Sequence, residues 1–415
     1  MTQAGLPVAL RRTRWLMIAL AFLATVINYL DRQTLSVAAP VLRKELNFGD
    51  IEYSRIVFAF MLAYTIMNGV SGPLIDRLGT RRGYALCMLW WSAASVLHAF
   101  ARSPFTLGVY RFLLGMGEAG NWPAAVKVVS EWFPVRERAL ASGIFNSGSA
   151  VGAVIAPPLV AWLVLRFGWQ AAFALVGAAG FLWLAGWLLV YHTPTESVTQ
   201  TAAPAPAVWP LFRQRFVWSL TLSKIFFDPV WYFYIFWIPQ YLNTVHGFDL
   251  AKIGLYGWIP FLTADIGNIA GGALSAVLMR WGLGVHASRK VTFVVFPLLM
   301  TSAIPAVLVP DARLSMAFVS AATFGYTGSL ANMLALPADA YPRNALASIW
   351  GLASMGSGFG GMLFSLLTGW VVAHYSYTPA FIGFGLLPLL AASILLGVSC
   401  PALPGVRGKA VAGRA

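Results

Sequence analysis

The chain has 415 residues, of which 59% are hydrophobic and only 10% are charged, against about 25% charged in an average soluble domain. The mean hydropathy of +0.73 and the repeated long apolar runs exclude a soluble globular protein and predict a multi-pass protein of the cytoplasmic (inner) membrane. The net charge of +14 does not indicate nucleic-acid binding, because the basic residues follow a membrane topology.

Apolar runs between charged or Pro/Gly breaks predict an all-α integral membrane protein with twelve transmembrane helices. A helix needs about 20 apolar residues to cross a hydrocarbon core of ~30 Å, and each run is close to this length. The predicted spans are 15–39, 53–75, 82–101, 105–126, 137–165, 169–191, 216–243, 250–280, 290–309, 314–336, 343–373 and 379–399.

The polar, Pro/Ala/Thr-rich segment 192–215 predicts a cytoplasmic linker. It separates an N-terminal six-helix half, 1–191, from a C-terminal six-helix half, 216–415, that ends in a short basic tail. The stretches "FPVRERALASGIFNSGSAVGAV" and "YPRNALASIWGLASMGSGFGGM" are similar, and each leads into the fifth span of its half. This similarity predicts two pseudo-symmetric repeats of the same orientation.

Most Lys and Arg residues lie in the termini and in the even-numbered loops. The positive-inside rule therefore predicts that both termini are cytoplasmic. Cys87 and Cys400 lie far apart in apolar surroundings, so we expect no disulfide, no metal site and no cofactor.

Two charges lie within the first span, in "NYLDRQTLSVAAP". As sequence neighbours, Asp31 and Arg32 diverge by about 100° around a helix and cannot face each other. We predict that Asp31 faces Arg111 of the fourth span and that Arg32 points into a central cavity, because charges at this depth are costly unless they serve a site. The alternative is that these charges only pair with one another as packing contacts.

The loop after the second span reads "GPLIDRLGTRR". It resembles the G-x-x-x-D-R-x-G-x-R-R/K motif of the major facilitator superfamily, which implies a cytoplasmic gate. Gly72 is expected to allow close helix approach, and Asp76 to face a helix N-terminus of the opposite half. Arg77 and Arg81 are expected to join a charge latch with Glu131.

The fourth span contains "YRFLLGMGEAG", which resembles a further motif of that superfamily. Arg111 and Glu118 are seven residues apart and share one helix face, about 10 Å from each other. Gly115 and Gly117 predict close packing against the first span.

The stretches "NYLDRQTLSVAAPVL", "SEWFPVRERALASGIFNSGSAVGAVIAPPLV" and "FFDPVWYFYIFWIPQYL" are similar to the hexuronate branch of the anion:cation symporter family within that superfamily. This resemblance implies uptake of glucuronate or galacturonate together with protons, by alternating access. Related carriers take galactonate, glucarate or other sugar acids. We expect a functional monomer in the lipid bilayer, with no nucleic-acid partner and no enzymatic activity.

A sugar acid needs a fixed cation, neutral hydrogen-bonding groups and an aromatic wall. Arg32 offers a bidentate fork to the carboxylate, and the resemblance implies that Tyr29, Arg32 and Tyr64 line the substrate cavity. The remaining substrate-site candidates are Asn146, Lys224, Tyr232, Asn332, Trp350 and Ser354.

The seventh span places Lys224 and Asp228 one helical turn apart, so the two can pair. Pro229 follows directly and predicts a kink near mid-membrane, which suits a gating helix. The alternative is that Lys224 extends to the cytoplasmic surface. Asp265 in the eighth span is either a hydroxyl acceptor or a partner of Asn268, and the sequence leaves both open.

We predict that Asp31 and Glu118 are the proton-linked acids, with Arg111 as their partner. Protonation would loosen the hold on Arg111 and make the cavity more positive, which favours an anionic sugar. A drug/proton antiporter is an alternative, but Arg32 and Lys224 disfavour a cationic cargo. Sodium coupling, a membrane enzyme and a transport-dead sensor are further alternatives; the scattered histidines disfavour the enzyme.

Overall fold

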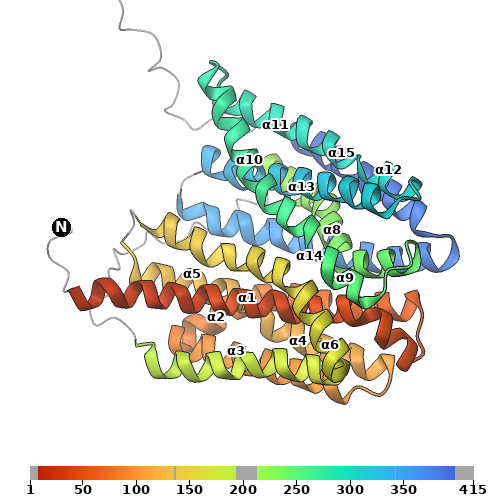
Figure 1. Cartoon of the computed structure of the whole chain (residues 1–415). Coiled ribbons are helices and arrows are strands. Elements are labelled where there is room, and N and C mark those ends of the chain that lie inside the picture. Colours follow the sequence, from red (N-terminus) through yellow and green to blue (C-terminus); the bar gives the residue numbers. More distant parts are fainter. Residues whose placement is uncertain (1–7, 135–136, 193–212, 342, 398–415) are drawn as a thin grey trace, which may run out of the picture.

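The computed structural model describes residues 8–134, 137–192, 213–341 and 343–397, and these contain helices and no β-strand. One group of helices lies in the lower part of Figure 1 and the other in the upper part. The first group consists of α1 (Val8–Glu45), α2 (Asp50–Leu78), α3 (Thr80–Leu97), the 3-10 helix η2 (His98–Phe100), α4 (Pro104–Glu118), α5 (Asn121–Trp132) and α6 (Arg138–Val190). The second consists of α8 (Arg215–Thr244), α9 (Leu250–Tyr256), α10 (Ile259–Arg280), α11 (Val285–Met300), α12 (Ala303–Leu308), α13 (Ala312–Ala340), α14 (Arg343–His374) and α15 (Tyr377–Leu396). Most of the predicted linker, 193–212, lies outside the described residues.

Eight helical stretches of the described chain are long and apolar enough to cross a membrane. One of them, 140–190, has 51 residues, roughly 75 Å at 1.5 Å per residue and far more than the ~30 Å of hydrocarbon. The helix is interrupted at Gly168, whose φ of 84° and ψ of 163° are not helical and lie in a region that glycine tolerates. Helix α6 is therefore two helices, which agrees with the separately predicted spans 137–165 and 169–191.

Three predicted spans that we expected to be continuous are interrupted. The range 105–126 contains the end of α4 at Glu118 and the start of α5 at Asn121, while 250–280 is divided between α9 and α10, and 290–309 between α11 and α12. Pro260 lies in the first turn of α10, where a backbone N–H would have no acceptor within the helix, so a proline is tolerated there. The pattern of apolar residues in the sequence does not reveal such short interruptions.

Small residues set the packing inside the first group. A Cβ at Gly148 or Gly152 of α6 would lie 2.5 Å from the Phe22 carbonyl oxygen or 2.8 Å from that of Val26, so α6 touches the α1 backbone. The prediction that Gly115 and Gly117 pack against the first span is wrong: Gly115 faces Phe60 of α2, and Gly117 lies against α3. Helix α4 is thus held by α2 and α3, with one face left toward α1.

The second group repeats this scheme. A Cβ at Gly356 or Gly360 of α14 would meet the carbonyl oxygens of Thr221 and Ile225 in α8, as Gly148 and Gly152 meet α1. Gly267 and Gly271 bring α10 against α13 in the same way as Gly115 brings α4 against α2. Close backbone approach at spaced small residues is typical of helices packed in membranes. The shared scheme supports the two-repeat interpretation of the sequence.

The two groups meet at the end of the molecule that carries the α1–α2 and α8–α9 connections. Arg43 donates to Asp50 at 2.8 Å and to the Gln240 side-chain oxygen of α8 at 2.9 Å. The Tyr53 hydroxyl donates to the Phe236 carbonyl at 2.6 Å, which joins α2 to α8. The Ser365 hydroxyl of α14 donates to the Ser54 carbonyl of α2 at 3.4 Å. This end is closed by polar contacts.

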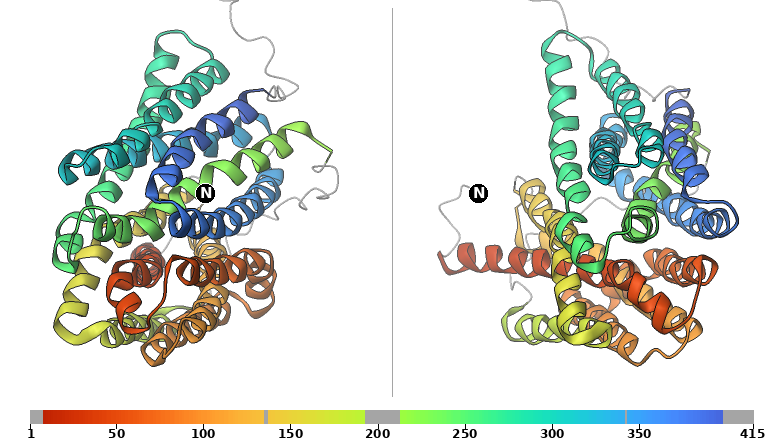
Figure 2. Two further views of the ribbon diagram at one scale, coloured as in Figure 1. Left: turned by 90° about the vertical axis from the view of Figure 1, so that its right-hand side faces the viewer. Right: turned by 45° about the vertical axis from the view of Figure 1, so that its right-hand side comes forward.

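At the opposite end the same helices are apart, and in the views of Figure 2 α10 and α11 extend away from the first group. A Cβ at Gly72 of α2, Gly143 of α6, Gly272 of α10 or Gly351 of α14 would have no atom within 4 Å. The prediction that Gly72 makes a close helix approach is therefore wrong in this conformation.

The predicted cytoplasmic latch also has different partners. Asp76 pairs with Lys127 of α5 at 2.7 Å, within its own group, rather than with a helix of the other group. The Glu131 carboxylate accepts 2.5 Å hydrogen bonds from Thr80 and Tyr191 and contacts no arginine in the described structure. Arg81 donates to the Leu188 carbonyl at 2.6 Å, while the Arg77 side chain is exposed. The contacts described for Asp76, Arg81 and Glu131 therefore all lie within the first group.

Candidate functional site

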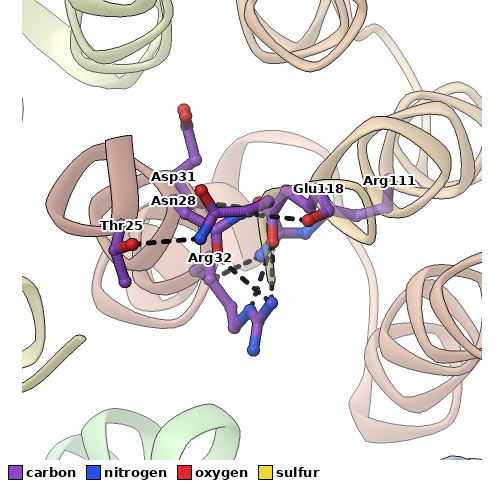
Figure 3. A network of polar contacts seen from close by, with 7 residues as sticks. Thr25, Asn28, Asp31, Arg32, Arg111 and Glu118 are labelled. Atoms are coloured by element: carbon purple, nitrogen blue, oxygen red, sulfur yellow. Dashed lines mark hydrogen bonds and ion pairs between the residues drawn. The ribbon is translucent and has the colours of Figure 1, made fainter. Parts of the chain in front are cut away.

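The buried centre of the first group holds an ion pair between α1 and α4 (Figure 3). The Arg32 guanidinium donates to Glu118 Oε2 from Nη2 at 3.0 Å and from Nε at 3.2 Å. Asn28, one turn earlier in α1, accepts from Arg32 at 3.3 Å. Arg32 is only 4% exposed and Glu118 is fully buried, so each charge depends on the other for compensation.

Arg111 and Asp31 do not form the side-chain pair that we predicted. Arg111 instead donates to the backbone carbonyls of Asp31 at 3.1 Å and Arg32 at 2.5 Å. The Asp31 carboxylate turns away from Arg32 in Figure 3 and accepts a hydrogen bond from the Ser95 hydroxyl of α3. Its second oxygen has no hydrogen-bond partner among the residues that the structure describes. Arg111 thus fixes the backbone of α1 at the site, and Asp31 is a buried acid of its own.

Aromatic rings surround the Arg32 guanidinium. Its central carbon lies 5.2 Å from the ring centroid of Tyr29, 5.3 Å from that of Phe60 and 4.8 Å from that of Tyr64. Such distances are within the range of cation–π attraction. The predicted grouping of Tyr29, Arg32 and Tyr64 is therefore present in the geometry, and Phe60 is a ring that the sequence did not single out.

Local structure explains how the pair is placed. Helix α4 ends at Glu118, so this residue leaves a carbonyl free to receive the Asn28 amide at 3.5 Å. Asn121, at the start of α5, accepts from Tyr84 at 2.6 Å and donates to Thr25 of α1 at 3.2 Å. Asn28 and Asn121 were absent from our predicted site, although polar residues deep in apolar spans were a signal that could have found them.

The second group contains its own charged pair on α8. Lys224 and Asp228 are 2.7 Å apart, with side chains only 8% and 7% exposed. This confirms the predicted intrahelical pairing and contradicts the alternative in which Lys224 reaches the surface. The Tyr326 hydroxyl of α13 donates to the other Asp228 oxygen at 3.2 Å, and the Lys224 ammonium lies 5.8 Å from the Trp350 ring.

Tyr232 connects the two clusters. It lies one turn after Asp228, and its hydroxyl is 3.2 Å from that of Ser357 in α14. Its ring lies at the boundary between the groups, because a Cβ at Gly361 of α14 would meet both the Tyr232 ring and the methyl group of Met61 in α2. The pair of the second group therefore lies close to the region where the two groups meet.

The remaining candidates differ in their surroundings. Asn146 is exposed on α6, and Ser354 is half-buried one turn before Gly358, which contacts Thr65 of α2. Asn332 is fully buried; its amide donates to Gly271 and Gly328 and accepts from Arg289, so its polar atoms serve contacts within the second group.

Comparison with known proteins identifies the family. Residues 21–309 match the model of the Major Facilitator Superfamily. The chain belongs to this superfamily. It is a multi-pass transport protein of the cytoplasmic membrane and not an enzyme, as the sequence predicted.

Relatives narrow the branch. The chain is 34% identical over 401 residues to the hexuronate transporter of Escherichia coli (strain K12), covering 92% of this chain and 93% of the relative. It is 35% identical over 306 residues to the galacturonate transporter of Dickeya chrysanthemi, covering 69% and 89%. These matches confirm the predicted hexuronate transporter branch.

A solved structure has the same fold. The bacterial homologue of the human lysosomal transporter Spinster, in an inward-facing and unoccupied conformation, gives a TM-score of 0.74 at 21% identity. The match covers 92% of this chain and 95% of that structure.

Proposed function

We propose that this chain imports a hexuronate, such as glucuronate or galacturonate, in symport with protons. The observation that carries the proposal is the buried Arg32–Glu118 pair, because the cation suited to a carboxylate is held by an acid that a proton can neutralise. The names of the hexuronate and galacturonate transporters among its relatives support this cargo.

The proposed topology has twelve spans with both termini in the cytoplasm. The eight apolar helical stretches supply nine spans, since 140–190 is divided at Gly168. The other three are α4 with α5, then α8, then α13, whose polar residues lower their hydropathy. The arginine-rich loops support the cytoplasmic orientation.

The two groups of helices are proposed to be the two halves of an alternating-access carrier, 1–191 and 216–415, that functions as a monomer. In the proposed orientation the closed end, with Arg43 and Tyr53, is extracellular, and the end around Gly72 and Gly351 is open to the cytoplasm. The described conformation is then the inward-facing one. Asp76, Arg77 and Arg81 would form the cytoplasmic closure in the opposite conformation.

The sugar acid would bind between the halves. Its carboxylate would take the place of Glu118 on the Arg32 fork, and Tyr29 and Tyr64 would contact the sugar ring and hydroxyls. Lys224, Tyr232, Trp350 and Ser354 would approach the cargo from the second half, and Asn146 from the cytoplasmic side. Asn332 has a packing role in this proposal.

Coupling follows from competition for Arg32. A proton on Glu118 removes the negative charge that holds the guanidinium, which frees it for the sugar carboxylate. A proton on Asp31 removes a second buried negative charge on the same turn of α1, while Arg111 keeps the backbone in place. Both protonations favour an anionic cargo, and their loss on the cytoplasmic side favours its release.

The test is uptake of labelled glucuronate and galacturonate into proteoliposomes, with and without an inward proton gradient. We expect accumulation above equilibrium only with the gradient, and no change when a sodium gradient replaces it. Uptake that is the same with and without the proton gradient would reject proton coupling. If neither sugar acid is taken up, the proposed cargo is rejected.

A further inference from the structure

The Asp228 carboxylate binds two partners, Lys224 and Tyr326. The proposed uptake of a monoanion does not require this arrangement. Asp228 uses one oxygen for Lys224 at 2.7 Å and the other for Tyr326 at 3.2 Å. The Tyr326 ring stacks on Phe227 at 4.7 Å and on Trp231 at 5.2 Å, so its hydroxyl is held in position. The structure thus holds Lys224 neutralised by a fixed partner.

The charges of the two clusters balance when all groups are ionised. In the first half Arg32 and Arg111 balance Asp31 and Glu118, and in the second half Lys224 balances Asp228. Protonation of Glu118 leaves one uncompensated cation, Arg32, which suits one carboxylate. A second carboxylate at the other end of the same sugar would need a second free cation.

We propose that Asp228, positioned by Tyr326, is a specificity-determining residue that restricts the site to sugar acids with one carboxylate. This inference rests on the proposed function. Asp228 neutralises Lys224 and places a carboxylate one turn before Tyr232, whose ring lies beside Gly361 of α14 and Met61 of α2 where the two groups meet. A hydroxyl or ring oxygen at that end of a hexuronate is tolerated there, whereas the second carboxylate of an aldarate is repelled.

The experiment compares galacturonate with galactarate, in which C1 is oxidised to a second carboxylate and the sugar is therefore an open chain, and it includes galactonate as the open-chain sugar acid with one carboxylate. All three are used to compete with labelled galacturonate for uptake by purified carrier in proteoliposomes. For the wild type we expect half-inhibition by galactarate to need at least about 100-fold more competitor than galacturonate, since like-charge contacts in a desolvated site are strongly unfavourable.

Asp228→Asn removes the negative charge and frees Lys224, so we expect the galactarate-to-galacturonate ratio to fall about tenfold or more. The matched control is the double variant Lys224→Gln with Asp228→Asn, which restores neutrality and should return the ratio toward that of the wild type. Tyr326→Phe removes the hydrogen bond that positions Asp228 but leaves its charge, so we expect the ratio to fall, but by clearly less than in Asp228→Asn.

Each outcome decides the inference. A wild type that accepts galactarate as well as galacturonate overturns it, and that measurement does not depend on any variant folding. An unchanged ratio in an Asp228→Asn protein that elutes as a folded monomer also overturns it. Failure of the wild type to take up galacturonate at all rejects the proposed function instead, so the two failures are distinguishable.

Discussion

Each group of helices holds one buried ion pair, and the two pairs differ in how they are built. Arg32 and Glu118 join helix α1 to helix α4, from positions 86 residues apart. Lys224 and Asp228 lie one turn apart on α8 and keep their distance whatever the neighbouring helices do. A pair between two helices depends on their relative position, so forming or breaking it is linked to movement of those helices. A pair within one helical turn determines the local charge of the site but is not linked to helix movement.

In the proposed mechanism, the first group of helices provides proton coupling and the second provides charge selection. The Gly148–Gly152 and Gly356–Gly360 contacts show that the two halves share one packing scheme, so the difference does not come from the scaffold. It comes from which side chains that scaffold carries.

The largest expected effect comes from breaking the interhelical pair. Glu118→Gln should abolish proton-driven accumulation while exchange of labelled for unlabelled sugar acid continues, because Arg32 stays free without needing a proton. Asp31→Asn should behave in the same way. Uptake and counterflow in proteoliposomes separate the two activities, and unaltered accumulation in both variants would refute the coupling assignment.

Arg32→Lys should weaken binding at constant charge. The ammonium keeps the positive charge but loses the planar fork that now makes two hydrogen bonds to Glu118. We expect roughly 10- to 100-fold weaker half-saturation, the range for losing one or two charge-assisted bonds. Retention of wild-type affinity in this variant would mean that the fork does not hold the carboxylate.

A substitution in the shared scaffold should destabilise the protein rather than alter coupling. A Cβ at Gly152 would lie 2.8 Å from both the Tyr29 Cβ and the Val26 carbonyl oxygen. Gly152→Val should therefore cost about 1–3 kcal/mol of stability, seen as a lower Tm in detergent. Gly143→Ala, at a position with no atom within 4 Å, is the matched control and should not lower the Tm.

Opening the closed end should shift the conformational balance. Arg43→Gln removes the ion pair to Asp50 and weakens the bridge to Gln240, both of them half-buried contacts. For a loss of about 1 kcal/mol we expect an approximately fivefold larger outward-open population. Labelling of a cysteine introduced at Ser54, in a background without Cys87 and Cys400, by a membrane-impermeant maleimide measures this, and equal labelling rates would contradict it.

The smallest stability effect is expected at Asp76. Its side chain is 73% exposed, and Lys127 is its ion-pair partner in the described part of the chain. Asp76→Asn should change stability by less than about 0.5 kcal/mol, yet slow transport if the outward-facing state needs the latch. A Tm equal to that of the wild type together with reduced uptake would support a latch role for Asp76. Normal uptake would reject that role.

The sequence by itself determined the membrane class, the positions of the buried charges and the Lys224–Asp228 pair. The first follows from composition, and helix geometry predicted the last, since residues one turn apart can pair, although only the structure excluded a Lys224 side chain that extends to the surface. The closely packed glycines of α6 and α14 were also visible as a repeated small-residue pattern.

Only the tertiary structure decided which charges meet between helices. Arg32 pairs with Glu118, Arg111 binds backbone carbonyls, and Asp31 turns to Ser95. These choices depend on the rotation and axial offset of α1, α3 and α4, which no sequence spacing specifies. The open surroundings of Gly72 likewise depend on which end of the molecule is closed, because the two halves contact each other at one end and separate at the other.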